Sequence, residues 1–213
     1  MMTKLNFSDE TKAFLYEIPS GCEYATDSRE LEIEDISSDR IEKLLSYLNS
    51  KNLLLVFESA NILTAWLNES GFNKLKELLF SDIFYSDAWA SFYQGQDMKE
   101  QILFSLGEYL SKMDDQGKLG FARAKVYMLI RKILNDAGRE VFGLGDFLFY
   151  VKTLQLTEYK APLQKYFLDL ISQEKTQTLK LNEIVTFFKR TDPTFLSETL
   201  VKFQKSLDDF DDY

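Results

Sequence analysis

Residues 53–67 read LLLVFESANILTAWL, and this stretch decides the fold class. Its apolar side chains recur at helical spacing and form one stripe, made of Leu53, Val56, Phe57, Ala60, Leu63 and Leu67. Ile62 and Trp66 widen the stripe, Asn52 is a suitable N-cap, and residues 68–71 end the segment. A helix with so wide an apolar arc usually packs against neighbours on more than one side.

Helical spacing continues along most of the chain. Further helices are predicted at about 38–48, 72–79, 97–114, 118–136, 145–154, 158–174, 181–190 and from Asp192-Pro193 onward, where the proline suits a first helical turn. Only within residues 13–35 do FLYEI and LEIEDI alternate as a short hairpin would. We therefore expect an all-α chain, or nearly so. Its parts are an acidic N-terminal segment (1–37) compatible with a hairpin, one helical domain (38–207) and an acidic-aromatic tail (208–213).

A short internal echo indicates a repeat. Residues 57–62 (FESANI) and 121–126 (FARAKV) share the pattern F-x-x-A-x-[IV], and each follows an apolar helix and a polar turn. Such helix pairs are typical of α-solenoids, in which each unit buries its apolar face on the next. The two stretches begin 64 residues apart. This separation exceeds the ~40–47 residues of HEAT and armadillo units, so a repeat of this kind would need an insertion. Residues 81–97 supply most of it.

The same region resembles a known group of proteins. Residues 54–66 (LLVFESANILTAW) followed by 69–75 (ESGFNKL) are similar to the helix-and-turn stretch of bacterial HEAT-like proteins often encoded beside secreted toxins. The resemblance covers about residues 40–137 and departs at Leu67, where a glycine is expected. It implies an irregular HEAT-like solenoid and an interaction or immunity role rather than catalysis.

Composition and charge narrow the setting. The longest apolar run is Leu53–Phe57, no signal-peptide core follows the N-terminus, and one cysteine permits no intrachain disulfide, so we expect a cytoplasmic protein that does not enter a membrane. The net charge is −9 and comes from the ends, with −6 in residues 1–40 and −4 in residues 191–213. This balance disfavours nucleic acid and favours a basic protein partner. The alternative is that the acidic ends only keep the chain soluble.

The residue types argue against most enzyme classes. The sequence contains no histidine, which excludes Ser-His-Asp and Cys-His nucleophile systems and HExxH zinc sites. Cys22 alone cannot build a thiolate metal site, and no phosphate-binding loop is present. We therefore expect no catalytic residues, no metal and no cofactor. Carboxylate pairs remain, but with 34 acidic residues their default role is salt bridging.

Aromatic residues gather in the predicted insertion, SDIFYSDAWASFYQGQD (81–97). They fill the gap between helix pairs or form a partner-binding surface rimmed by carboxylates. Both roles can hold together, with Phe84 and Phe92 buried and Tyr85, Trp89 and Tyr93 partly exposed. The acidic-aromatic tail is either a frayed end or a hook for a basic groove. The candidate partner-binding residues are Asp82, Tyr85, Asp87, Trp89, Tyr93, Asp97, Asp208, Asp209, Phe210, Asp211, Asp212 and Tyr213.

These observations predict a non-enzymatic protein-binding module. Its most specific form is an acidic immunity-type protein that neutralises a cognate basic toxin. A general bacterial or phage adaptor that uses a helical-repeat surface is the alternative, and a carboxylate-dependent enzyme is the third hypothesis.

Overall fold

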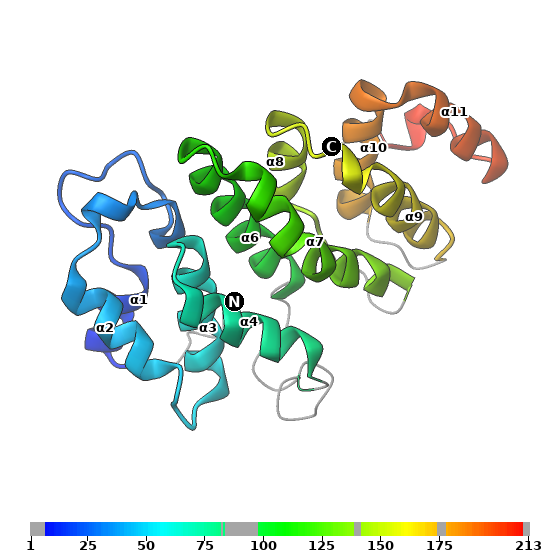
Figure 1. The fold of residues 1–213 in the computed structure, drawn as a ribbon. Coiled ribbons are helices and arrows are strands. Elements are labelled where there is room, and N and C mark those ends of the chain that lie inside the picture. Colours follow the sequence, from blue (N-terminus) through cyan, green and yellow to red (C-terminus); the bar gives the residue numbers. More distant parts are fainter. Residues whose placement is uncertain (1–6, 82, 84–97, 139–141, 174–177, 211–213) are drawn as a thin grey trace. The chain divides into compact units, whose positions relative to one another are not determined.

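The computed structural model describes residues 7–81, 83, 98–138, 142–173 and 178–210 (Figure 1). Every regular element in these residues is an α-helix or a 3₁₀ helix, and none of them is a strand. The prediction of an all-α fold is therefore confirmed. The chain divides into two compact units, Met1–Ala122 and Arg123–Tyr213, where the sequence suggested one helical domain over 38–207.

Unit 1 is built around one central helix. Its elements are α1 (Asp9–Tyr16), η1 (Ser28–Glu30), η2 (Ile33–Asp35), α2 (Ser38–Tyr47), α3 (Leu53–Ala65), α4 (Glu69–Phe80) and α6 (Met98–Asp115). Helix α3 contacts α1, α2, α4, α6 and η1, and Figure 1 shows it between α2 and α4. It is buried around its circumference, including the polar Ser59, Asn61 and Thr64. Helix α3 thus packs against neighbours on more than one side, as its wide apolar arc predicts.

Helices α3 and α4 meet at a glycine. A Cβ placed on Gly71 would lie 2.3 Å from the Cβ of Leu63, far inside van der Waals contact. Only a residue without a side chain fits there while α3 and α4 keep this distance. This contact is part of the packing that α3 makes with α4, its most extensive partner in unit 1.

The prediction of an N-terminal hairpin is wrong. Residues 9–16 form helix α1, which begins where the Ser8 side chain accepts a hydrogen bond from the backbone N–H of Thr11. Residues 28–35 form two short 3₁₀ helices, the first opened by a capping box between Asp27 and Glu30. Capping side chains thus satisfy the backbone locally and override the alternation of apolar residues.

Most helix boundaries agree with the predicted ones. Asn52 caps α3 by accepting from the N–H groups of Leu54 and Leu55, and Asp192 caps α11 (Pro193–Lys202) with the proline in its first turn. Helix α2 begins at Ser38, where the predicted segment begins, and is capped by Ser37. Capping residues therefore place the helix starts to within a residue or two.

Helix α3 ends with a residue in the left-handed conformation, Leu67, at φ 59°. The N–H of Asn68 bonds the carbonyl of Leu63, at 2.8 Å, which completes a Schellman turn. Glycine adopts this left-handed conformation without strain, whereas the leucine found here carries a side chain into it. Helix α6 ends in the same way at Gly117, at φ 68°.

Unit 2 begins within α7 (Leu119–Asn135) and contains η4 (Asp136–Gly138), α8 (Phe147–Thr153), η5 (Thr157–Tyr159), α9 (Lys160–Ile171), α10 (Thr178–Thr191), α11 and η6 (Leu207–Phe210). Its core is aromatic: the rings of Phe167, Phe188 and Phe195 stack edge-on or tilted on one another. Tyr166 is fully buried and donates its hydroxyl to the carbonyl of Phe142.

The two halves of the sequence echo occupy different environments. Phe57 is fully buried in α3, whereas Phe121 is 64% exposed on α7. Ala60 is buried, and Ala124 is exposed. The two stretches are therefore not equivalent positions of a repeat, and the solenoid architecture stays a prediction from the sequence.

Candidate functional site

Half of the predicted partner-binding residues belong to the aromatic insertion. Asp82, Tyr85, Asp87, Trp89, Tyr93 and Asp97 lie outside the described residues, so the choice between core and interface stays open for them.

The tail departs from its prediction at one residue. Phe210 is buried with 8% exposure in η6, which packs on α10, and the Nζ of Lys205 lies 5.8 Å from the centroid of its ring. Phe210 is thus an anchor of unit 2 and is not available to a partner. Asp208 and Asp209 are exposed, while Asp211, Asp212 and Tyr213 lie outside the described residues.

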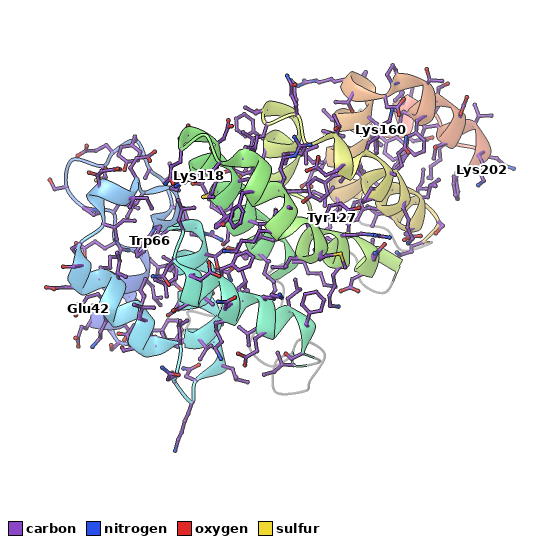
Figure 2. All side chains as sticks on the ribbon, in the orientation of Figure 1. Glu42, Trp66, Lys118, Tyr127, Lys160 and Lys202 are labelled. Carbon is purple, nitrogen blue, oxygen red and sulfur yellow. The ribbon has the colours of Figure 1, made fainter. Side chains whose placement is uncertain are left out.

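A stronger candidate is the exposed part of residues 9–42, which we call the acidic N-terminal surface. It consists of the exposed side chains of Asp9, Glu10, Glu17, Glu23, Glu32, Glu34, Asp35, Asp39 and Glu42, the last on α2 in Figure 2. The cations of residues 7–47 are half-buried or buried, and Lys12 and Lys43 pair with Asp9 and Glu10. The surface is therefore strongly negative.

An aromatic side chain stands within this surface. Tyr24 is 53% exposed, yet its hydroxyl is fixed: it donates to Asp35, at 2.7 Å, and accepts from the N–H of Glu32, at 2.9 Å. Burial of the hydroxyl and its bond to Asp35 raise the pKa of Tyr24 to about 12. The result is a solvent-facing ring whose hydroxyl is held by the Asp35 carboxylate and the N–H of Glu32.

The charged side chains of Arg29 and Lys112 are fixed by hydrogen bonds within unit 1. Arg29 donates from Nε and Nη2 to the two carboxylate oxygens of Asp27, each at 2.8 Å, and from Nη1 to the carbonyl of Gln101. Lys112, which pairs with Glu108, donates to the carbonyl of Arg29. Burial opposes ionisation of Asp27, but the bonds from Arg29 prevail and hold its pKa below the usual range.

Asp27, Arg29 and Gln101 line a polar cavity of about 220 Å³, together with Tyr16, Ser28, Glu58 and Ile62. Burial and a hydrogen bond to Glu58 raise the pKa of Tyr16. Each charged group of the cavity thus already bonds another lining residue, Asp27 with Arg29 and Glu58 with Tyr16. Such an arrangement fastens η1 to α3 and α6.

The described residues also bear on metal binding, thiol reactivity and membrane insertion. Within them no three or more Asp, Glu or Cys side chains gather as a metal site would require. Cys22 is buried, and its burial together with the Asp35 carboxylate raises the pKa of the thiol, which disfavours the nucleophilic thiolate. No helix of the described segments has the length and apolar character needed to cross a membrane.

Arg123 forms a two-pronged pair with Glu158, with 2.8 Å between Nε and Oε1. This bond ties α7 to η5 within unit 2.

Sequence reasoning missed Tyr24 as a site residue. Its only signal was an aromatic residue between Glu23 and Asp27 in a predicted hairpin, and nothing in the sequence showed that Asp35 and Glu32 would hold it.

Comparison of the chain with protein-family models, with curated proteins and with solved structures gives no match. The function must therefore be argued from the surfaces themselves.

Proposed function

We propose that this chain is a non-enzymatic protein-binding module whose acidic N-terminal surface binds a basic protein. The observation that carries the proposal is Tyr24, an exposed ring locked in place by Asp35 and Glu32. Tyrosine is enriched among the residues that dominate interface energetics, and a ring fixed before binding loses little conformational entropy on association. The exposed carboxylates of the acidic N-terminal surface make the proposed binding site negatively charged.

The charge of unit 1 supports a basic partner. Unit 1 carries 11 basic and 21 acidic side chains, whereas unit 2 carries 14 and 13. An acidic field of this kind steers a basic partner during encounter and disfavours acidic competitors. The specific form that we propose is an immunity-type protein that neutralises a cognate basic toxin, in line with the resemblance of residues 40–137.

The test compares two charge-reversed variants that change the net charge equally. Glu32→Lys/Glu34→Lys alters the acidic N-terminal surface, and Asp146→Lys/Glu198→Lys alters exposed positions of unit 2. Wild type and both variants are used to capture proteins from a lysate of the source cells, and the Kd of the captured partner is then measured at several salt concentrations. Circular dichroism checks that both variants fold.

We expect a basic protein that binds wild type and the unit 2 variant but binds the Glu32/Glu34 variant at least roughly tenfold more weakly. Its affinity for wild type should fall as salt rises. Equal binding to both variants, or an acidic partner, would refute the proposal. The captured partner is then expressed in growing cells with and without this chain. If the chain is an immunity protein, the partner alone should stop growth and the chain should restore it, whereas a protein that only binds the partner should not.

A further inference from the structure

Unit 2 contains an apolar groove between α8 and α10 that the proposed function does not use. One hollow of about 330 Å³ is lined chiefly by Val151, Leu156, Leu163, Phe187 and Phe188. A second hollow of about 220 Å³ is lined by Leu148, Phe149 and Phe187 among others. The two adjoin, because Lys152, Phe187 and Thr191 line both. We call them together the α8–α10 groove.

Phe149 marks this groove as more than a packing defect. It is 62% exposed on α8, with its ring set against Tyr150 at a centroid distance of 5.7 Å. A large exposed aromatic residue next to an apolar hollow is typical of a surface that another molecule covers.

The charged residues that line the two hollows sum to a net charge of +1, with Lys152, Lys160 and Arg190 against Glu183 and Asp192. Lys160, at the start of α9 (Figure 2), bonds Asp192 at 3.0 Å. Glu183 keeps its negative charge, although its carboxylate accepts hydrogen bonds from the N–H groups of Leu144 and Gly145. Lys152 and Arg190 are exposed and form no ion pair within the described part of unit 2. Two exposed cations without an ion-pair partner therefore border an apolar floor.

We propose that the α8–α10 groove binds an acidic amphipathic helix of a protein partner. An apolar side chain of that helix would enter each hollow, and its carboxylates would pair with Lys152 and Arg190. Two adjoining hollows match the spaced anchors of a helix laid in a groove. Two separate cations suit a segment with several carboxylates better than an amphiphile with a single one.

This inference goes beyond the proposed function because it concerns the other unit and a partner segment of opposite charge. A chain with an acidic surface on unit 1 and a cationic groove on unit 2 would connect two different proteins.

The test uses a short synthetic helical peptide with leucine at i, i+3, i+4 and i+7 and glutamate at the remaining positions. Its binding to the full chain is measured by fluorescence anisotropy. We expect saturable binding that Lys152→Glu/Arg190→Glu weakens roughly tenfold or more, because two charge pairs become repulsive. Lys189→Glu/Lys202→Glu, which reverses two exposed charges outside the groove, should leave the affinity unchanged.

Phe149→Ser tests the apolar part. Because Phe149 is exposed, the variant should have the melting temperature of wild type and should still bind the peptide more weakly. The proposal is overturned if a peptide with lysine in place of glutamate binds equally well, or if both double variants weaken binding equally. It is also overturned if dodecanoate binds the groove and the acidic peptide does not.

Discussion

The guanidinium carbon of Arg40 lies 5.1 Å from the centroid of the Trp66 ring, and these two side chains attach the N-terminal segment to α3. Arg40 donates to the carbonyls of Phe14, Leu15 and Glu17, which lie at the C-terminal end of α1. Trp66, labelled in Figure 2, donates from its indole N–H to the carbonyl of Ser28, at 2.8 Å. One stacked pair thus holds both α1 and η1, and with them the acidic N-terminal surface.

Arg40→Lys should lower the free energy of unfolding of unit 1 by about 2 kcal/mol, although it keeps the charge. Lysine cannot reproduce the planar fork that reaches three carbonyls, and it leaves buried acceptors unsatisfied. Arg40→Ala, which also removes the stacking on Trp66, should cost about 3–5 kcal/mol. Urea unfolding followed by tryptophan fluorescence measures both. A loss below about 0.5 kcal/mol for the lysine variant would contradict this role of the guanidinium.

Gly71→Ala should destabilise unit 1 although alanine is the better helix former. The new Cβ would lie 2.3 Å from Leu63 Cβ and push α4 from α3, which costs about 1–3 kcal/mol or more. Gly120→Ala is the matched control. It also lies in a first helical turn, and its new Cβ meets no atom within 4 Å, so it should stabilise by up to about 1 kcal/mol. Thermal melting of both variants gives the comparison, and equal shifts would exclude a tight α3–α4 contact.

Substitutions at two residues with left-handed backbone conformation, Gln204 and Gly117, should change the stability in opposite directions. Gln204 is exposed at φ 55° after α11, so Gln204→Gly should relieve strain and stabilise by about 1 kcal/mol. Gly117→Gln should destabilise by a similar amount, because it forces a side chain into the φ 68° conformation after α6. Denaturant midpoints report both changes, and shifts of the same sign would show that contacts other than the backbone conformation decide.

The helices were predictable because their signals are local. Asn52, Asp192-Pro193 and the apolar periodicity each act within a few residues, and the structure bears them out. The N-terminal segment was not predictable, because its conformation depends on Arg40 and Trp66, which are distant in sequence from the groups that they hold. The same holds for Tyr24, whose position depends on Asp35. The exposure of Phe121 likewise could not be read from a pattern that it shares with the buried Phe57.

Acid should weaken unit 1 in part through Asp27. Its pKa is lowered in the folded chain by Arg29, so its contribution to stability is complete above the unfolded value of about 4 and is lost as the pH falls through the lower folded value. Asp27→Asn removes this titration. We expect the free energy of unfolding of the variant to be lower at pH 7 and to fall less than that of wild type below about pH 4. Parallel pH dependences of wild type and variant would show that the Asp27–Arg29 pair does not stabilise the fold.

Tyr24 should matter more for binding than for folding. Its ring is 53% exposed, so Tyr24→Ala removes little buried surface and should cost about 1 kcal/mol of stability, mainly from the lost bonds to Asp35 and Glu32. If the ring is the anchor for a basic partner, the same change should weaken binding by about 2 kcal/mol or more. Tyr24→Phe separates the two effects, because it keeps the ring and removes the hydroxyl. It should bind with a smaller loss, since the ring is present but less firmly positioned. Melting temperature and partner Kd, measured for both variants, decide the role. A large melting loss for Tyr24→Ala with unchanged Kd would make Tyr24 a structural residue, and the acidic surface would then lack its anchor.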